Sequence, residues 1–282
     1  MTEAGTPMVS VCMPVYLCEK FIFESIQSVL NQCFPDFELI VIDNASPDDT
    51  YRIASEIKDS RLRVYRNDTN LGLEGNWNKV LSLAKGRYVK LLPGDDTIYP
   101  DCLQKQVEVL ENESNRDVVL VYCARDIIDA HGRKVLRAKF AGEGRIDGDQ
   151  LVRKTLRYGT NIIGEPGAVL FRREVGNKVG PIDSTLGYVT DLDYWVRLLR
   201  LGAAYAIPEA LCTFRLSGEN WSVRLGHERR RQFVRFAEKL ATLDRRISRL
   251  DLLLSKFMAH INEMLRVIVY KQLIGIGTAH RN

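Results

Sequence analysis

Short apolar runs alternate with segments of helical periodicity through the first half of the chain, and this alternation limits the fold more than any other feature. Strands are predicted at residues 9–14, 38–42, 63–66, 88–92 and 118–122, with helices around 23–30, from 46–49 onward, at 77–83 and at 102–110. Strands that alternate with helices are joined by right-handed crossovers, so their sheet is largely parallel and covered by helices on both faces. The predicted fold class is therefore α/β, with a Rossmann-like central sheet.

The second half of the chain has a weaker pattern. Residues 125–187 are rich in Gly and Arg, and we expect hairpins and loops there, with one helix near 149–158. Helical spacing returns at 194–201, and a strand-like segment follows at 203–214. We expect a main domain over residues 1–225, with halves 8–125 and 126–225, and a helical extension over 226–282.

The C-terminal segment is basic and has its own periodicity. Residues 228–274 contain eleven Lys or Arg and five Asp or Glu, and no Pro or Gly. Apolar residues from Leu240 to Ile268 alternate steps of three and four, which fits one helix of roughly 70 Å at 1.5 Å per residue or a helical hairpin. Three partners are open for this amphipathic stripe: the main domain, a second copy of the chain, or an anionic membrane surface, which the arginines favour.

Size and composition exclude several classes of protein. A chain of 282 residues can bury a full core, and no apolar run reaches the roughly 18 residues that span a bilayer. The first residues show no basic segment followed by an apolar one, and the six cysteines form no C-x-x-C pair, so we expect a cytoplasmic protein with reduced thiols. Because the excess positive charge belongs to the C-terminal segment, we expect no nucleic-acid partner.

Two adjacent acids, Asp95 and Asp96, follow the predicted strand at 88–92, where Pro93 and Gly94 stop regular pairing. In an open α/β sheet, ligands bind at the carboxyl ends of the strands. Carboxylates there suit Mg²⁺ or Mn²⁺ holding a diphosphate. A solvated acidic turn is the alternative interpretation, because Gly-Asp-Asp is also ordinary turn chemistry.

Several further segments accompany the acidic pair in a fixed order. They are Pro14-Val15-Tyr16, then Ile42-Asp43-Asn44-Ala45-Ser46-Pro47-Asp48-Asp49-Thr50, then Asn70-Leu71-Gly72, Asn76-Trp77-Asn78 and Ala84-Lys85-Gly86. In order and spacing this pattern resembles family 2 glycosyltransferases over about residues 8–225. The resemblance implies a GT-A fold, a nucleotide diphosphate sugar as donor, and transfer with inversion of the anomeric centre.

The resemblance also implies roles in nucleotide binding. Pro14, Val15 and Tyr16 match residues that flank the base, and Asp43 matches one that accepts a hydrogen bond from the base imide or holds the ribose. Asn78 matches an asparagine close to the nucleotide. A carboxylate at Asp43 favours a UDP-sugar or dTDP-sugar without excluding a GDP-sugar. A turn or helix cap is the alternative role for Asp43.

The metal site implied by the resemblance is incomplete in this chain. Asp95 and Asp96 match the last two acids of a DxDD motif and are expected to bind Mn²⁺ or Mg²⁺ together with the diphosphate. Pro93 stands where the family has its first acid, and Trp77 stands where an arginine is common. Ser217 replaces a histidine, so a third ligand from that loop is in doubt.

A later segment, residues 187–198, resembles the family's ED-x-D/E-x-W-x-R-L motif, with Thr190 in the first acid's place. In the family the second acid is the catalytic base, which here is Asp191. A sugar hydroxyl is a poor nucleophile and needs such a base as it attacks. Capping of the following helix is the alternative role for Asp191, and the two roles are compatible. Asp193 is expected to be structural, and Trp195 and Leu198 to lie in the core.

Three residues are candidates for contacts with the donor or acceptor sugar. Glu165 precedes a predicted strand in a region where the family shapes the sugar pocket. Arg215 is expected either to reach the phosphates or to form a surface ion pair. Trp221, in a polar loop, is expected either to stack on an acceptor sugar or to fold back into the core.

These observations predict an inverting, metal-dependent glycosyltransferase that acts on a hydroxyl of a saccharide or lipid-linked saccharide, in polysaccharide or glycolipid synthesis. We expect it to be cytoplasmic and peripheral at the cytosolic face of a membrane. A catalytically inactive scaffold subunit that binds nucleotides is one alternative. A sugar-phosphate nucleotidyltransferase is a weaker one, because residues 14–21 lack the glycines of its phosphate loop.

Overall fold

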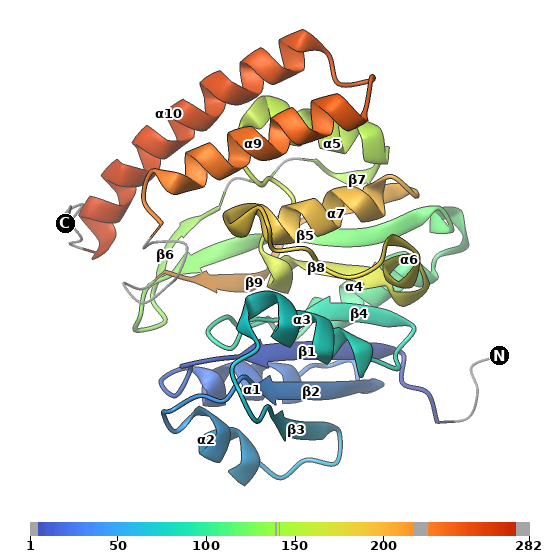
Figure 1. The fold of residues 1–282 in the computed structure, drawn as a ribbon. Coiled ribbons are helices and arrows are strands. Elements are labelled where there is room, and N and C mark those ends of the chain that lie inside the picture. The colour runs from blue at the N-terminus through green and yellow to red at the C-terminus, as the bar shows by residue number, and fades with distance from the viewer. Residues whose placement is uncertain (1–4, 139, 141, 217–224, 275–282) are drawn as a thin grey trace.

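A mixed sheet runs through the whole molecule, as Figure 1 shows for the computed structural model, which describes residues 5–138, 140, 142–216 and 225–274. Its strands are β1 (Val9–Val15), β2 (Phe37–Asp43), β3 (Leu62–Arg66), β4 (Tyr88–Leu91), β5 (Val118–Ile128), β6 (Lys134–Arg137), β7 (Gly144–Ile146), β8 (Val169–Arg172) and β9 (Ala203–Arg215). Its helices are α1 (Ile22–Leu30), α2 (Thr50–Glu56), α3 (Gly72–Ser82), α4 (Cys102–Glu111), α5 (Gly148–Tyr158), α6 (Arg173–Val179), α7 (Thr190–Leu199), α9 (Glu228–Leu243) and α10 (Arg249–Ile274), with short 3-10 turns η1 (Glu113–Asn115), η2 (Pro166–Ala168) and η3 (Gly187–Val189).

The first half of the sheet is parallel, as the alternation of strands and helices predicts. Strands β3, β2, β1 and β4 lie side by side in that order, and each neighbouring pair is parallel. Side chains of β1 point alternately to two apolar cores: Val11 and Met13 pack with α1, and Cys12 packs in the cluster that contains Val80 of α3. Burial on both faces explains why these strands read as continuous apolar runs. The α/β fold class is confirmed.

The second half of the sheet is mixed, which the weak pattern of residues 125–187 did not reveal. Strand β8 lies between β4 and β5 and is antiparallel to both, whereas β9 is parallel to β5. Strands β6 and β7 pair antiparallel to β5 and β9. Because β8 runs in the reverse direction, the residues before it lie at the same sheet edge as the residues after β1, β2 and β4. This brings Glu165 to the edge that carries Asp95.

The C-terminal segment is a helical hairpin, not one continuous helix. Helices α9 and α10 are separated by residues 244–248 and pack against each other, with α9 on η3 and α10 on α5 (Figure 1). Phe236 and Ala259 belong to the same apolar cluster as α5 and α7. Gly159 ends α5 at φ +64°, and a Cβ there would lie 2.3 Å from the backbone nitrogen of Ala259, so the two helices are in close contact. The inner face of the hairpin therefore packs on the rest of the chain.

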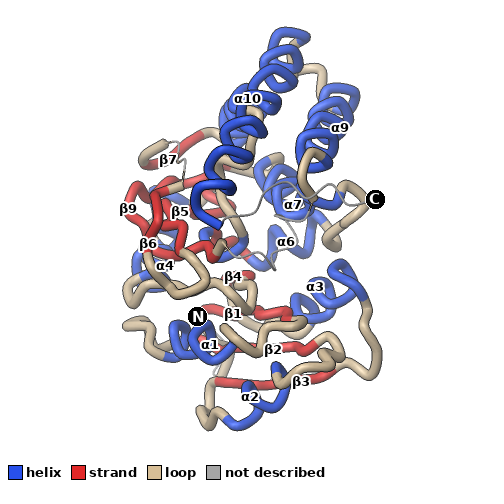
Figure 2. Tube along the Cα trace, turned by 90° about the vertical axis from the view of Figure 1, so that its left-hand side faces the viewer, coloured by secondary structure: helices blue, strands red, loops and turns tan. Residues whose placement is uncertain are grey.

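The tube view in Figure 2 shows the hairpin above the sheet, on the opposite side of the molecule from β1, β2 and β3. The boundary at residue 225 between a main domain and an extension stays a prediction. Within the described residues, no helix combines the length and the apolar character that crossing a bilayer requires.

Candidate active site

Two adjoining cavities lie at the carboxyl-end edge of the sheet. The first, called here the Tyr16 cavity, has a volume of about 870 Å³ and is bounded by the loops after β1 and β2. The second, the Asp191 cavity, has a volume of about 430 Å³ and lies between the sheet, α7 and α10. The two cavities share the lining residues Leu73, Trp77, Pro93, Asp95, Gly187 and Thr190. Asp95 therefore faces both cavities.

The loop after β1 forms one wall of the Tyr16 cavity. Pro14, Val15 and Tyr16 all line it, as the resemblance implies, and Tyr16 is largely exposed to it. Leu17 has a φ of +56°, a left-handed conformation that a leucine rarely adopts. Its backbone N–H donates to the Ser46 hydroxyl at 3.1 Å, which ties the loops after β1 and β2 together.

Asp43, at the end of β2, is buried beneath the Tyr16 cavity and is not among the residues that line it. Its Oδ2 accepts a hydrogen bond from the Ser46 backbone N–H at 3.1 Å and lies 3.3 Å from Nε of Arg66. The side chain thus closes the turn after β2, which was the alternative role for this residue. Its part in recognising the base stays a prediction.

Asparagines connect the floor of the Tyr16 cavity. Asn67 donates from its amide to the side-chain oxygens of Asn44 and Asn76, at 2.9 and 3.0 Å. Asn44 and Asn76 line the cavity, whereas Asn78 lines neither cavity. Asn78 instead exchanges two hydrogen bonds with the backbone of Ile182, at 2.9 and 2.8 Å, and so joins α3 to the loop before α7. Asn44 and Asn76 are functional candidates that the sequence analysis did not single out, although both lie inside its motifs.

The acidic turn after β4 is held from behind by Arg215, the last residue of β9. The Arg215 backbone N–H donates to Oδ1 of Asp96 at 2.8 Å, and its Nε donates to the carbonyl oxygen of Asp95 at 2.8 Å. Its guanidinium also pairs with Glu24 at 2.6 Å and lies 4.5 Å from the ring centre of Phe21. Arg215 is buried and lines neither cavity, so in this structure it positions the acidic turn.

Asp95 and Asp96 fit a divalent cation. Asp96 is buried, and desolvation, followed by the charge of Asp95, raises its pKa well above the usual value. A cation at this edge would offset two carboxylates that are costly to keep charged side by side. No cluster of three acidic, histidine or cysteine side chains able to hold a metal occurs among the described residues. Two carboxylates and the oxygens of a bound diphosphate are therefore the donor set that this part of the chain offers.

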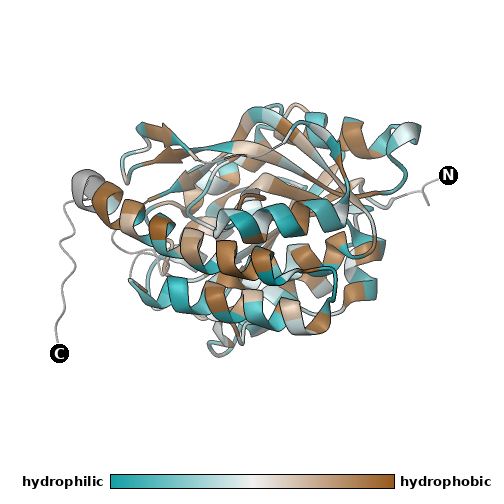
Figure 3. Ribbon diagram, turned by 90° about the horizontal axis from the view of Figure 1, so that it is seen from above, coloured by the Kyte–Doolittle hydropathy of each residue, from teal (hydrophilic) through white to brown (hydrophobic). Residues whose placement is uncertain are grey.

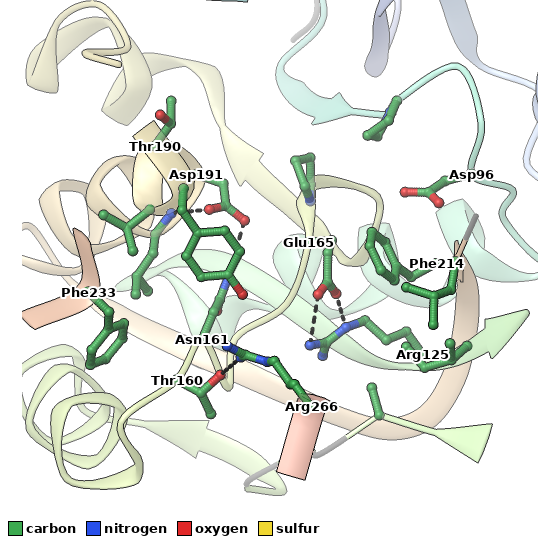
Figure 4. Close-up of a pocket in the computed structure, with 18 of the residues that line it drawn as sticks. Asp96, Arg125, Thr160, Asn161, Glu165, Thr190, Asp191, Phe214, Phe233 and Arg266 are labelled. Atoms are coloured by element: carbon green, nitrogen blue, oxygen red, sulfur yellow. Dashed lines mark hydrogen bonds and ion pairs between the residues drawn. The ribbon is translucent and has the colours of Figure 1, made fainter. Parts of the chain in front are cut away.

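Asp191 lies in the first turn of α7 and faces the second cavity (Figure 4). Its Oδ2 accepts a hydrogen bond from the amide of Asn161 at 3.1 Å, and its Oδ1 accepts one from the backbone N–H of Leu192 at 2.7 Å. Asn161 is itself fixed, because its side-chain oxygen accepts from the N–H groups of Ile163 and Gly164 at 3.0 Å each. Sequence reasoning missed Asn161, whose contact with Asp191 spans thirty residues of chain.

Burial of Asp191 raises its pKa to about 7, and the nearby charge of Glu165 adds to the shift. Glu165 forms an ion pair with Arg125, which is buried in β5 (Figure 4). The positive charge of Arg125 acts in the opposite direction on Asp191. Arg125 was not predicted either, although a basic residue inside the apolar run of β5 is the signal that marks it.

Helix α10 forms a wall of the Asp191 cavity. Its lining residues are Asn262, Leu265, Arg266, Val269 and Tyr270. Arg266 donates to the Thr160 hydroxyl at 2.5 Å, next to Asn161, and its guanidinium lies 5.6 Å from the ring centre of Tyr188. The predicted C-terminal extension thus supplies part of the site.

The remaining predicted residues lie in the core, in an ion pair away from the cavities, or outside the described part of the chain. Trp195 and Leu198 are buried in the core, as predicted. Asp193 points away from the cavities and pairs with Arg197 at 2.9 Å. Trp221 and Ser217 lie outside the described residues.

Comparison with known proteins gives this arrangement a context. A family model described as Glycosyl transferase family 2 matches residues 10–180. An uncharacterised protein of Mycobacterium tuberculosis is 31% identical over 233 residues, which make up 79% of this chain and 72% of that protein. The Escherichia coli UDP-Glc:alpha-D-GlcNAc-diphosphoundecaprenol beta-1,3-glucosyltransferase WfaP is 35% identical over 106 residues, which make up 38% of this chain and 42% of that enzyme.

Solved structures share the fold. TarS of S. aureus in complex with UDP-GlcNAc superposes with a TM-score of 0.67 at 18% identity, over 92% of this chain and 72% of that one. The mannosyltransferase PcManGT from Pyrobaculum calidifontis, in complex with GDP-Man and Mn²⁺, gives 0.65 at 19% identity, over 98% of this chain and 77% of that one. The fold is the GT-A fold that the resemblance implies.

Proposed function

This chain belongs to glycosyl transferase family 2, and on that premise we propose that it transfers a sugar, with inversion, from a nucleotide diphosphate sugar to a hydroxyl of a saccharide acceptor. One observation carries the proposal: Asp95 faces both cavities, and Asp191 faces only the second. A donor in the Tyr16 cavity would place its diphosphate at Asp95. The anomeric carbon would then lie between the acidic turn and Asp191.

The Tyr16 cavity is the proposed nucleotide site. Tyr16 offers an exposed ring to the base, and the backbone around Pro14 and Val15 bounds it. Asp43 is proposed to act through the turn that it closes beneath the base. The solved relatives include one complex with UDP-GlcNAc and one with GDP-Man, so the base is left to experiment. A uridine or thymidine diphosphate remains our first expectation.

Asp95 and Asp96 are the proposed metal ligands, with Mn²⁺ or Mg²⁺ between them and the diphosphate. When bound, the metal offsets the negative charge that the departing diphosphate gains. The protein's own contribution is the shape of the turn, because Arg215 fixes the Asp95 carbonyl and the Asp96 carboxylate. Burial raises the pKa of Asp96, and a nearby cation would favour its ionised form.

Asp191 is the proposed general base. It would accept the proton of the acceptor hydroxyl as that oxygen bonds to the anomeric carbon and the bond to the diphosphate breaks. A pKa of about 7 suits this task, because the group is part ionised near neutral pH and still binds a proton well. A single displacement with a single base inverts the anomeric centre, so no second carboxylate needs to form a covalent intermediate.

The acceptor is proposed to be a saccharide carried on a lipid. The Asp191 cavity is lined mainly by apolar side chains, including Leu265 and Val269 of α10, and also by the polar Arg125, Glu165 and Asn161. Such a lining fits a sugar joined to an apolar carrier. The similarity to WfaP, whose name gives a diphosphoundecaprenol acceptor, supports the same class. We place the reaction at the cytosolic face of a membrane, in the synthesis of a polysaccharide or glycolipid.

The test begins with the donor. A thermal-shift series of UDP, dTDP and GDP, each with and without Mn²⁺, ranks the bases, because stabilisation grows with the logarithm of the ligand excess over Kd. The best nucleotide should stabilise the protein more with Mn²⁺ than without it. If calorimetry then finds no nucleotide diphosphate bound with or without Mn²⁺, the transferase proposal fails.

The base assignment is tested with the donor so identified. We expect Asp191→Asn to lower kcat for transfer by about 10²–10⁴-fold, because it removes the proton acceptor while keeping the shape of the side chain. Asp193→Asn, two residues along the same helix and outside both cavities, is the matched control and should change kcat little. Nucleotide affinity should stay the same in both variants. Full activity in Asp191→Asn contradicts the assignment.

A further inference from the structure

We propose that the outer face of α10 docks on an anionic lipid bilayer and holds the mouth of the Asp191 cavity at the membrane surface. The docking itself does not depend on catalysis. Its purpose, the delivery of a lipid-borne acceptor, rests on the proposed function. The inner face of α10 is already covered by α5 and α9, so only the outer face is free to meet a partner.

The outer face of α10 exposes several large apolar side chains, which is unusual for a helix that faces only water. They lie on one side of the helix, with the half-buried Ile261 between the first four and the last three: Leu250, Leu253, Leu254, Phe257, Met264, Leu265 and Ile268. Leu253 is 65% exposed and Phe257 61% exposed. Figure 3 shows hydrophobic residues as brown bands along the helix that leads to the C-terminus. A continuous exposed stripe of this kind marks an interaction surface, not scattered surface residues.

The exposed charge of the hairpin is mainly basic. Seven basic residues over 228–270 are exposed: Arg231, Arg235, Lys239, Arg245, Arg246, Arg249 and Lys256. Glu238, whose side chain is 46% exposed, pairs with Lys256. The acids of the hairpin turn inward or pair with neighbouring bases. On α10 itself, Asp251 is buried against Arg157, and Glu263 is buried against Arg229.

This charge pattern favours an anionic membrane over a second copy of the chain as the partner of α10. Among the described residues, Arg235, Arg245 and Arg249 have no carboxylate within ion-pair distance. Two copies of the hairpin brought face to face would oppose like charges, which disfavours self-association through α10. Anionic headgroups attract the same arginines near the membrane surface. An apolar stripe flanked by bases is the pattern of a helix that lies in the membrane interface.

The position of the stripe links the bilayer to the site. Leu265 is exposed on the stripe and also lines the Asp191 cavity. Arg266 and Asn262, on the adjacent side of the helix, line the same cavity. With α10 lying at the level of the headgroups, the cavity opens beside them. An acceptor can therefore keep its lipid in the bilayer while its sugar reaches Asp191.

The experiment is a vesicle flotation assay on the full chain without donor or acceptor. It uses vesicles of phosphatidylcholine alone and of phosphatidylcholine mixed with phosphatidylglycerol. The test variant combines Leu253→Gln with Phe257→Gln, neither of which lines a cavity. The matched control combines Leu201→Gln with Phe23→Gln, which are 52% and 57% exposed on other elements. Circular dichroism and the unfolding midpoint check that both variants are folded.

We expect the parent chain and the control to float with the anionic vesicles, less with neutral vesicles, and less as salt rises. The test variant should partition at least tenfold more weakly, because two large apolar side chains no longer enter the interface. Equal flotation of the test variant and the control overturns the proposal. The proposal is also overturned if sedimentation shows that the parent chain is a dimer and the test variant a monomer, while neither protein binds vesicles. The assay measures membrane binding and not sugar transfer. A negative result therefore rejects the membrane docking and leaves the proposed transferase activity untouched.

Discussion

Asp191 holds its proton to a higher pH than an ordinary aspartate because burial and the charge of Glu165 both disfavour its ionised form. For a general base the sign follows directly: the active form is the deprotonated one, present above the pKa and lost as the pH falls through it. The hydrogen bond from the Leu192 backbone N–H and the charge of Arg125 limit this rise in pKa. The hydrogen bonds from Asn161 and Leu192 fix the direction of the carboxylate.

This environment predicts a pH dependence. We expect kcat/KM for transfer to fall about tenfold per pH unit below pH 7, with the limb set by Asp191 in the free enzyme. Glu165→Gln removes a negative neighbour and releases Arg125 to act on Asp191, so the limb should move to lower pH. Glu174→Gln, an exposed change on α6, is the control and should leave the limb in place. A limb that moves to higher pH in Glu165→Gln contradicts this account.

Single residues also show where sequence reasoning reached its limit. Asp95, Asp96 and Asp191 were predicted because each follows a recognisable motif, and all three line a cavity. Asn161 and Arg125 were not predicted, because their contacts join segments thirty to forty residues apart. No local pattern records such a contact.

At the scale of elements, Arg215 makes the position of the acidic turn after β4 depend on strand β9. The last residue of β9 holds both residues of the turn after β4, although β8 and β5 lie between the two strands in the sheet. A short motif gives no information about which way its arginine points. The sequence left phosphate contact and an ion pair open, and the structure shows an ion pair with Glu24 together with backbone contacts.

The dependence can be tested by shortening the side chain. Arg215→Met should lower the free energy of unfolding by about 1–3 kcal/mol, because the Asp95 carbonyl loses its buried donor. It should also weaken Mn²⁺-dependent nucleotide binding, since the turn is no longer fixed. Glu24→Gln, which removes only the half-exposed partner, should cost less than about 1 kcal/mol. Urea unfolding and calorimetry measure the two effects, and unchanged values in Arg215→Met refute them.

Strand length decided which elements could be predicted. Strands β1 to β4 alternate with helices, and their positions were predicted within a residue or two. Strand β5 was predicted at 118–122 but continues to Ile128. Strands β6, β7 and β8 contain three or four residues each, too few to show a period. The reversal of β8 is a property of sheet pairing that its own four residues do not encode.

The molecule as a whole closes its site with its C-terminal hairpin. Arg229 of α9 and Glu263 of α10 form an ion pair at 2.8 Å with both side chains buried. Helix α10 is also the helix that lines the Asp191 cavity. The amphipathic pattern of this segment predicted helices but left their partner open. Which face packs inward depends on η3, α5 and α9 together, and this could not be read from the stripe alone.

The buried pair predicts a double-mutant result. Arg229→Met or Glu263→Leu alone should lower the free energy of unfolding by about 3–5 kcal/mol, because each breaks this ion pair at a buried position. The double variant should recover most of that loss, since both charges are then absent. Urea unfolding of the four proteins measures the cycle. Additive losses would show that the pair does not join α9 to α10.

The place of β8 between β4 and β5 has a consequence for synthesis. A ribosome releases β4 well before β8, so the edge of β4 that later pairs with Phe171 and Arg172 has no partner from its own chain during that interval. At about 5–20 residues per second the interval lasts roughly 4–16 s. An unpaired strand edge invites pairing with other nascent chains. The strand order that brings Glu165 to the site thus leaves this edge of the half-made chain open to pairing with other chains until β8 is synthesised.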